Sequence, residues 1–316
     1  MVCRDIRPLE DEEMKMPSVL RMNIWRVLYH SGMAGTFSDE LYTKFMYWAY
    51  MGHCLNLDCP VDFNQKVQWL KLYYHNPLYV TCADKYEVRK YVKAKIGAQY
   101  LNECIGVYDK VEDIVFDELP SRFAIKATHG SGWNLICKDK SQFDWAAACK
   151  VMRKWMRSDF SKVGREWQYH RIQPRIVIEA FMEEPDGTPL RDYKLFTFEG
   201  ETKYVAVEFD KKDGLHYLNI YDAEGRFQTD KKIGNRNDPS YIKALPPCWF
   251  KMQSLAHALA EDFPMCRVDF YVLGGERIVF GELTFTPGKG CYSISPQTFC
   301  DEMGSYINLP KHILTK

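Results

Sequence analysis

The sequence contains no uninterrupted apolar stretch of about 18 residues, so we expect no membrane-spanning helix. The first twenty residues carry Arg4, Asp5 and a run of further acids but no apolar signal segment, which favours a cytoplasmic protein. Basic and acidic residues balance at 42 each, so no excess positive charge is present to attract nucleic acid. The eleven cysteines include no CxxC pair, and Cys54 and Cys59 lack a second pair to complete a zinc site. We therefore expect reduced thiols.

What remains is the composition of an ordinary soluble globular protein. Hydrophobic residues make up 46 % and charged residues 27 % of the 316 residues, enough for one large or two modest domains with a core. Aromatic residues reach 15 %, and many lie between residues 69 and 91, where we expect them to pack between helices. No internal repeat or low-complexity segment is present.

The first hundred residues are expected to be helical. Apolar residues at helical spacing predict helix over residues 18–52, broken at residues 31–32 and 34–35. Asn64 is expected to cap a helix that runs through Tyr74 and is closed by Pro77. Asp84 is expected to open another helix that ends at Gly97.

Strand signals begin after residue 100, and the fold class that we expect is α+β. Short strands are predicted over residues 105–107, 123–127, 135–137, 175–179, 194–198, 203–208, 218–221, 267–272 and 277–283, and helices over residues 142–158 and 249–262. We expect a helical N-terminal region at residues 1–100, a small lobe at 101–182 and a larger lobe with antiparallel strands at 183–316.

The first candidate site is the glycine-rich segment from Lys126 to Asn134, which directly follows an apolar strand. Gly130 and Gly132 allow several backbone N–H groups to point at one anion, while Lys126 adds a fixed charge and Ser131 adds a hydroxyl donor. The spacing of a P-loop is absent. The pattern is typical of a phosphate cradle, but a plain hairpin turn would show it as well.

The second candidate is a pair of strands that carry Arg267 and Asp269 on one and Glu282 and Thr284 on the other. Alternate residues of a strand share a face, so a hairpin would bring these side chains together. Two carboxylates with a hydroxyl suit magnesium, and arginine suits a phosphoryl group in transfer. A solvent-facing row of charges remains the alternative, although the intervening residues are apolar.

Two further segments are weaker candidates. Gly288 and Lys289 lie in a glycine-rich turn just past Glu282, suited to a second anion or substrate contact, or simply to the end of a strand. The strand that ends at Glu179 continues into Ala180, Phe181 and Met182. Such a segment suits a slot for a flat ring, or an ordinary core strand.

Taken together, these motifs occur in an order that resembles an ATP-grasp enzyme, and more closely the TupA-like branch of that group, named after a teichuronopeptide biosynthesis protein. The resemblance covers about residues 60–300. It rests on the following segments: Asn64-Gln-Lys-Val-Gln-Trp-Leu-Lys71, Asn76-Pro-Leu-Tyr79, Ala83-Asp-Lys-Tyr86, His129-Gly-Ser-Gly132, Gly164-Arg-Glu-Trp167, Asp192-Tyr-Lys194 and Gly281-Glu-Leu-Thr-Phe285.

The resemblance implies an ATP-grasp fold, in which two α+β lobes clasp ATP and magnesium, and a role for each motif. Lys126 would contact the α- and β-phosphates, Arg267 would stabilise the transition state, and Lys85 would contribute to the nucleotide side. The phosphate loop would comprise His129, Gly130, Ser131, Gly132 and Asn134. Glu179, Ala180, Phe181 and Met182 would surround adenine, and Asp192 or Lys194 would reach the ribose or phosphates. Asp269, Glu282 and Thr284 would hold magnesium.

Two departures from the usual ATP-grasp pattern matter. Thr284 stands where most of these ligases have asparagine, so a second metal ion would be held less well, although the TupA-like branch resembles this chain there. The usual N-terminal α/β substrate domain is replaced by about 100 residues of helical pattern, and the acceptor therefore cannot be carried over.

The function that the resemblance implies is an ATP-dependent carboxylate–amine ligase that acts through an acyl phosphate in cell-surface polysaccharide biosynthesis. Family members often lie among capsule genes, which leaves open an association with glycan assembly enzymes and an acidic or glycan substrate. Three alternatives remain: a kinase of a glycan hydroxyl with His129 or His170 as base, a glycosyltransferase, as the family is sometimes labelled, and a non-catalytic nucleotide-binding partner. No Asp-x-Asp motif supports the glycosyltransferase.

Overall fold

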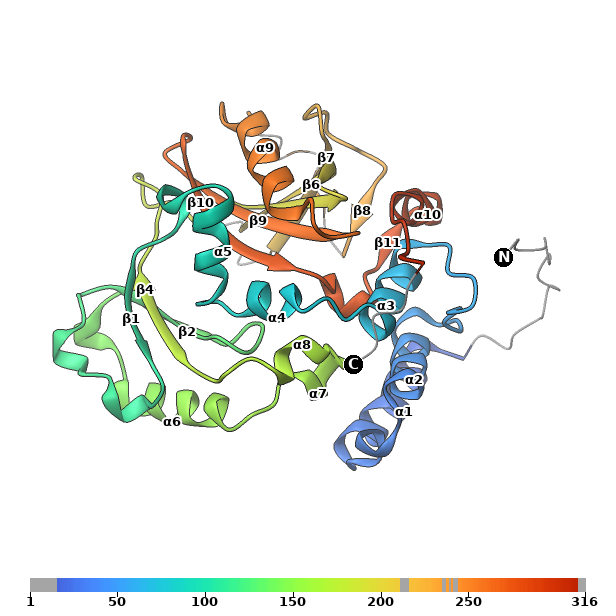
Figure 1. Cartoon of the computed structure of the whole chain (residues 1–316), viewed down its shortest axis with the longest axis horizontal. Coiled ribbons are helices and arrows are strands. Elements are labelled where there is room, and N and C mark those ends of the chain that lie inside the picture. Colours follow the sequence, from blue (N-terminus) through green and yellow to red (C-terminus); the bar gives the residue numbers. More distant parts are fainter. Residues whose placement is uncertain (1–15, 211–215, 235–236, 239, 241–243, 312–316) are drawn as a thin grey trace.

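The computed structural model of the chain describes residues 16–210, 216–234, 237–238, 240 and 244–311. Residues 1–15, with Arg4 and Asp5, and the last residues of the expected large lobe lie outside these ranges. The described part has helices first, then a four-stranded antiparallel sheet, then a five-stranded antiparallel sheet (Figure 1). This order confirms the expected α+β class.

The N-terminal helices are α1 (Ser18–His30), α2 (Asp39–Met51), α3 (Phe63–Tyr73), α4 (Leu78–Ala83) and α5 (Val88–Lys95). The predicted break between the first two is present, since α1 ends at His30 and Gly32 has a φ of +80°. Ser38 begins α2 by accepting a hydrogen bond from the Leu41 amide at 3.2 Å. In Figure 1, α1 and α2 form an antiparallel hairpin beside α3.

Three helix boundaries differ from the prediction. Asp62, rather than Asn64, caps α3, because its carboxylate accepts from the Gln65 amide at 2.9 Å. Asn64 lies inside the first turn of α3, and its side-chain amide exchanges two hydrogen bonds with the backbone of Tyr292 in a distant loop. Pro77 precedes α4 instead of closing α3, since its φ of −55° suits a helix start. The helix expected from Asp84 begins at Val88.

The small lobe contains a sheet with the strand order β1-β4-β2-β3. Its strands are β1 (Cys104–Tyr108), β2 (Phe123–Ala127), β3 (Asn134–Cys137) and β4 (Ile176–Ala180). Helix α6 (Trp145–Met156) packs against it through Met152 and Trp155, which join Phe123, Ile125 and Ile178 in one buried cluster. Two short helices, α7 (Ser161–Gly164) and α8 (Trp167–His170), connect α6 to β4.

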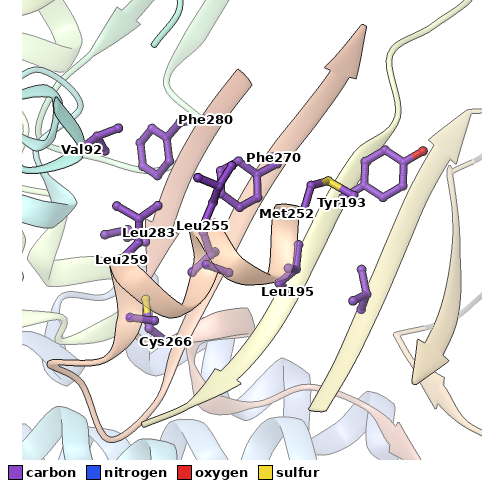
Figure 2. Close-up of a cluster of buried hydrophobic side chains, with 14 of the residues drawn as sticks. Val92, Tyr193, Leu195, Met252, Leu255, Leu259, Cys266, Phe270, Phe280 and Leu283 are labelled. Atoms are coloured by element: carbon purple, nitrogen blue, oxygen red, sulfur yellow. The ribbon is translucent and has the colours of Figure 1, made fainter. Parts of the chain in front are cut away.

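The large lobe contains a sheet with the strand order β10-β9-β5-β6-β7. Its strands are β5 (Asp192–Phe198), β6 (Glu201–Asp210), β7 (His216–Asp222), β9 (Cys266–Leu273) and β10 (Arg277–Thr284). Helix α9 (Trp249–Ala260) covers one face, where Leu195, Met252, Leu255, Phe270 and Leu283 are buried together (Figure 2). This face is therefore apolar along its length.

The opposite face of the large sheet is divided. At one end α3 and α10 (Gln297–Ser305) bury Phe196, Tyr204 and Ile220, and a short antiparallel pair, β8 (Lys232–Ile233) with β11 (Ile294–Ser295), lies beside them. At the other end the same face carries Lys194 and Asp269, which are paired across β5 and β9. Helices thus cover half of this face and leave a polar half toward the small lobe.

Two expectations from composition can be compared with the described residues. No helix within these residues combines the length and the apolar character needed to cross a membrane. No disulfide joins two cysteines of the described part of the chain.

Candidate functional site

A cavity of about 560 Å³ lies between the two sheets. The small lobe and the loop before α5 contribute Lys85, Lys126, Ser131, Gly132, Trp133, Asn134 and Glu179. The large lobe contributes Asp192, Lys194, Glu208, Asp269, Tyr271, Gly281 and Glu282. Predicted site residues from segments more than 150 residues apart in the sequence therefore line the same cavity.

Lys126 lies on β2 and is held by an acid of the neighbouring strand. Its Nζ lies 2.7 Å from Oε2 of Glu179, which is only 7 % exposed. Arg89 of α5 approaches the other carboxylate oxygen at 3.5 Å. The Glu179 carboxylate therefore directs the Lys126 ammonium into the cavity, where it can meet an anion.

The glycine-rich loop between β2 and β3 is anchored at both ends and exposed at its tip. His129 is buried, and its Nε2 lies 2.9 Å from the Trp155 carbonyl oxygen, while burial lowers its pKa. Trp133 packs edge-on against His129 and stacks with Trp155. Ser131 and Gly132 remain exposed, and Gly132 has a φ of +70°, which favours glycine. The tip, and not His129, therefore borders the cavity.

Lys85 links the loop to the N-terminal helices. Its amide donates to the Thr128 carbonyl at 3.3 Å, and its ammonium donates to the Gly130 carbonyl. Burial lowers the pKa of Lys85. The Lys85 ammonium thus holds the glycine-rich loop in position and also lines the cavity.

The segment predicted to surround a flat ring follows β4 at the edge of the cavity. The Ala180 amide donates a hydrogen bond to the Glu103 carbonyl at 3.0 Å, and the Ala180 carbonyl accepts one from the Asn102 side-chain amide at 2.8 Å. Phe181 and Met182 follow the strand and are partly exposed, and Arg122 lies over the Phe181 ring. None of these three residues lines the cavity itself, although Glu179 does.

Arg267, Asp269, Glu282 and Thr284 converge on the polar face of β9 and β10. The guanidinium of Arg267 binds both oxygens of Asp269, at 2.7 and 2.6 Å, and approaches Glu282 at 3.1 Å and Thr284 at 3.2 Å. Arg267 and Asp269 are buried, whereas the Glu282 side chain is 42 % exposed. The hairpin geometry predicted from strand alternation therefore exists.

A bulge at Gly281 sets the direction of Glu282. Phe280 is paired with Phe270 and Glu282 with Asp269, so that Gly281 is an extra residue in β10. A Cβ at this position would lie 3.0 Å from the Asp269 carbonyl oxygen, which explains the glycine. Because of the bulge, Phe280 packs into the core while Glu282 faces the cavity.

A second charged cluster lies one strand further along the sheet. Lys194 contacts the Asp192 carboxylate, Glu208 at 3.0 Å and Asp269 at 3.4 Å. Burial, followed by the charge of Asp269, raises the pKa of Asp192 to about 7. Burial alone would lower the pKa of Lys194, but the charges of Asp269 and Asp192 reverse the direction and raise it. Lys194 is thereby kept cationic within the cavity.

Five carboxylates and three ammonium groups line the cavity, while Arg267 and Arg89 pair with Asp269 and Glu179. An anionic ligand here would face carboxylates as well as ammonium groups, and a bound cation would offset their repulsion. No three His, Cys, Asp or Glu side chains of the described residues are grouped so as to hold a metal ion unaided. Asp269 and Glu282 offer the oxygen donors that magnesium prefers, and magnesium usually completes its shell with phosphate oxygens and water. The residues present therefore fit magnesium bound together with a phosphate ligand.

The last predicted pair, Gly288 and Lys289, lies in the short 3₁₀ helix η6 (Pro287–Gly290), beyond the end of β10. Neither residue lines the cavity. Lys289 has a φ of +58°, which is uncommon for a residue with a side chain. Tyr292, just past η6, accepts a hydrogen bond from the Arg267 guanidinium at 3.0 Å, so the segment that follows this pair contacts Arg267.

Sequence reasoning missed Glu208 and Tyr271, which also line the cavity. Tyr271 follows Asp269 by two residues and so shares its face, a signal that alternation alone contained. Glu208 lies opposite Asp192 in the pairing of β6 with β5, which only the register reveals.

A comparison with protein families finds that the family model described as TupA-like ATPgrasp matches residues 65–308. A search of curated proteins finds no match.

Several solved structures are similar to the chain at low identity. D-alanine–D-alanine ligase from Bacillus anthracis complexed with ATP is 14 % identical, with a TM-score of 0.38 over 65 % of this chain and 55 % of that one. The Helicobacter pylori enzyme of the same name is 14 % identical, with a TM-score of 0.42 over 78 % and 69 %. An L-amino acid ligase from Bacillus licheniformis is 12 % identical, with a TM-score of 0.40 over 80 % and 55 %. The match thus spans little more than half the length of the first of these structures.

Proposed function

Because this chain belongs to the TupA-like ATP-grasp family, we propose that it is an ATP-dependent carboxylate–amine ligase that acts through an acyl phosphate. The family carries with it the ATP-grasp fold, which agrees with two antiparallel sheets that face one cavity. The observation that carries the proposal is this cavity, where Lys126 and the glycine-rich loop face Asp269 and Glu282. We name ATP as the ligand, as in the Bacillus anthracis structure.

Each lobe has a part in holding the nucleotide. Lys126 and Lys85 contact the phosphates, and the exposed tip at Ser131 and Gly132 donates its amides to them. The segment from Glu179 to Met182 borders adenine, and Lys194 reaches the phosphates from the large lobe. The proposed domains are a helical region at 1–100, a small lobe at 101–182 and a large lobe at 183–316.

The chemistry begins when a substrate carboxylate oxygen attacks the γ-phosphorus of ATP, and ADP leaves. Asp269 and Glu282 hold magnesium with Thr284 beside them, and the ion supplies charge neutralisation to the phosphates when bound. Arg267, fixed by Asp269 at 2.6 Å, stabilises the transferring group. An amine then displaces phosphate from the acyl phosphate and forms an amide.

We further propose that the substrate is a sugar acid or an amino acid, joined to a cell-surface glycan in the cytoplasm. The support is the family, named after a teichuronopeptide biosynthesis protein. ATP and magnesium are the cofactors, and glycan assembly enzymes are candidate partners.

The alternative of a hydroxyl kinase requires a general base near the phosphates. His129 is buried behind the loop and engaged by Trp155, and His170 is exposed and paired with Asp159 at 3.0 Å. Neither lines the cavity, so no observation favours a kinase over the ligase. An amide or a stable phosphoester in the product distinguishes the two. A glycosyltransferase, the other alternative, would consume a nucleotide sugar and not ATP.

The decisive experiment measures magnesium-dependent ATP binding by calorimetry, and phosphate release with a pool of amino acids and sugar acids. It uses the wild-type protein and the variants Glu282→Ala and Glu276→Ala. Glu276 lies exposed in the turn of the same hairpin, outside the cavity, and serves as the matched control.

We expect binding and acid-stimulated phosphate release in the wild type and the control, with both lost in Glu282→Ala. Absence of ATP binding by folded wild-type protein would rule out the proposed function. Equal activity in Glu282→Ala would show that the metal assignment is wrong.

A further inference from the structure

A second cavity, of about 310 Å³, lies where the N-terminal helices meet the connection from α6 to β4. Its lining comes from Asp39, the first residue of α2, and from residues between Asp159 and Arg171, a segment that includes α7 and α8. Among the described residues, none lines both this α7–α8 cavity and the cavity between the two sheets. The volume lies at the lower end of the range for small-molecule sites, about 300–1,000 Å³.

Both acids of the α7–α8 cavity are engaged by neighbours. Asp39 lies 3.3 Å from the Arg165 guanidinium. Asp159 accepts hydrogen bonds from the Ser161 hydroxyl at 2.6 Å and the Ser161 amide at 3.0 Å, and it lies 3.0 Å from Nδ1 of His170. Burial alone would raise the pKa of Asp159, but the hydrogen bonds from Ser161 and His170 lower it. An ammonium group of a ligand would therefore have to compete for these carboxylates.

Two cations of the same cavity have no acidic partner. Lys162 and Arg171 line it, and neither side chain forms an ion pair or a hydrogen bond within the part of the chain that the structure describes. The Arg171 guanidinium lies over the Trp167 ring, 5.4 Å from its centre, which holds it at the wall of the cavity. A negative charge in this cavity would thus meet two cations without displacing an existing ion pair.

The N-terminal region maintains the shape of the cavity at Arg165. This residue has a φ of +56°, which is uncommon for a residue with a side chain. Its guanidinium donates to the carbonyls of Ala34 and Gly35, at 3.3 Å each, and lies over the Tyr42 ring, 4.6 Å from its centre. Backbone strain of this kind is concentrated at functional sites, where the surrounding structure maintains it.

Trp167 connects the wall of the cavity with the large lobe. Its ring is stacked with Tyr79 at a centroid distance of 6.2 Å, and Tyr79 is stacked on Phe285 at 3.8 Å. Phe285 directly follows β10, the strand that carries Glu282. Packed rings of this kind support a site on rigid elements. The α7–α8 cavity is therefore a built feature of the fold, although it is separate from the cavity between the sheets.

We propose that the α7–α8 cavity binds a sugar unit that carries a carboxylate or a phosphate. The anionic group pairs with Lys162 and Arg171. An ionised carboxylate has about four acceptor sites, so Asp159 retains acceptors for sugar hydroxyls beside its present partners. A zwitterionic amino acid fits less well, because its ammonium group would compete with Arg165 and His170 for the two carboxylates.

The inference rests on the proposed ligase function only in taking this sugar to be part of the acidic or glycan substrate. Binding itself needs no ATP, because the two cavities share no lining residue. A sugar held at α7 and α8 leaves the cavity between the sheets to the nucleotide. The α7–α8 cavity then selects a charged glycan by a unit that does not itself react.

Saturation-transfer NMR, which detects weak ligands, measures binding to the full chain without nucleotide. The probes are glucuronic acid and glucose 6-phosphate, with glucose as the neutral control and alanine as the zwitterion. The variants are Arg171→Gln, Lys162→Gln and, as the matched control, Arg157→Gln. Arg157 is an exposed arginine at the end of α6, before the same connection and outside the cavity.

We expect one or both of the acidic sugars to bind, and glucose and alanine to remain unbound. Loss of one charge-assisted hydrogen bond should weaken binding by about 10-fold or more in Arg171→Gln and in Lys162→Gln. Arg157→Gln should bind like the wild type. The sugar that binds distinguishes a carboxylate ligand from a phosphate ligand. An unchanged Tm, expected for exposed side chains, shows that each variant is folded.

Four results would overturn the inference: no binding of either acidic sugar, equal binding of glucose, binding of alanine in their place, or wild-type affinity in Arg171→Gln or Lys162→Gln. None of them touches the ligase function, which ATP binding and phosphate release test separately. A failure to bind ATP would in turn leave the sugar-binding result unchanged.

Discussion

At the scale of the single residue, the burial of Glu166 predicts a pH dependence of stability. Glu166 is 6 % exposed, and burial raises its pKa to about 7. Because this pKa is higher in the folded than in the unfolded chain, protonation of Glu166 favours the folded protein. This contribution to stability should be lost as the pH rises from about 4.5 to about 7. Urea unfolding across this range, with Glu166→Gln for comparison, tests the prediction, and an equal pH slope in the two proteins would contradict it.

Asp269 and Glu282 should differ in their effect on stability. Asp269 is 2 % exposed and binds the buried Arg267 at both oxygens, so Asp269→Ala removes the two-oxygen partner of a buried charge and leaves Glu282, at 3.1 Å, as its carboxylate partner. We expect a loss of about 3–5 kcal/mol in the free energy of unfolding. Glu282 is 42 % exposed, and Glu282→Ala should cost less than about 1 kcal/mol.

Urea unfolding of both variants without ATP measures the difference. Comparable losses would mean that Arg267 does not depend on Asp269. Thr284→Val, which removes only the hydroxyl 3.2 Å from Arg267, should fall between the two.

Residue types and spacing predicted part of the cavity lining, and the resemblance to the TupA-like family added Lys85, Asp192 and Lys194. Lys126, Asp269 and Glu282 could be predicted because each lies in an apolar strand, where a charged side chain indicates a binding role. No role could be predicted for Glu166, because it lies in a connection with no periodic pattern. Its environment comes from Lys71 and Thr286, which are distant in the sequence, and no spacing rule could connect them.

At the scale of the element, the start of α3 can be tested by comparing two helix caps. Asp62 is 5 % exposed and accepts from Gln65 at 2.9 Å, whereas Asp144 caps α6 through Ala147 at the same distance but is exposed. Asp62→Ala should cost about 2 kcal/mol and Asp144→Ala about 0.5–1 kcal/mol in the free energy of unfolding.

Chemical denaturation of the two variants measures these costs. A larger loss for Asp144→Ala would mean that burial does not strengthen the cap.

Strand positions were predicted well because apolar residues recur at every second position along strands of both sheets, as in β5 and β9. Short elements were not predicted. Helix α4 has six residues and α7 and α8 four each, too few for a helical period to be visible. Asn64 was chosen as the cap of α3 on residue type, but tertiary contact with Tyr292 occupies its side chain, and Asp62 caps instead.

At the scale of the whole molecule, ligand binding between the lobes should stabilise the fold. Magnesium and ATP at about 100 times the Kd should add about 2.7 kcal/mol to the free energy of unfolding. Because Asp269 and Glu282 line the cavity where the proposed magnesium would separate them from the phosphates, ATP with a chelator should stabilise far less. Thermal unfolding with ATP and either magnesium or the chelator measures this.

An equal shift in Tm under both conditions would contradict a metal-dependent site. Glu282→Ala should remove most of the difference between the two conditions, and Glu276→Ala none of it.

The sequence could not show how the N-terminal helices relate to the lobes. Their apolar patterns predicted packing but no partner. The structure places α3 against the large sheet and against the loops at Gly164 and Tyr292, through hydrogen bonds between residues 93 and 228 positions apart in the chain. Such contacts depend on the closed topology of the whole molecule.

The bulge at Gly281 has a consequence for the gene. In a regular strand, losing one codon turns every later side chain to the opposite side of the sheet. In β10 the surplus residue is Gly281 itself, so losing its codon would leave Phe280 toward α9 and Glu282 toward the cavity. Loss of the codon for Val279 or Leu283 would instead turn later side chains of the strand over, so that the cavity side and the side covered by α9 exchange residues. Natural variation in the length of this hairpin arm should therefore be found at codon 281.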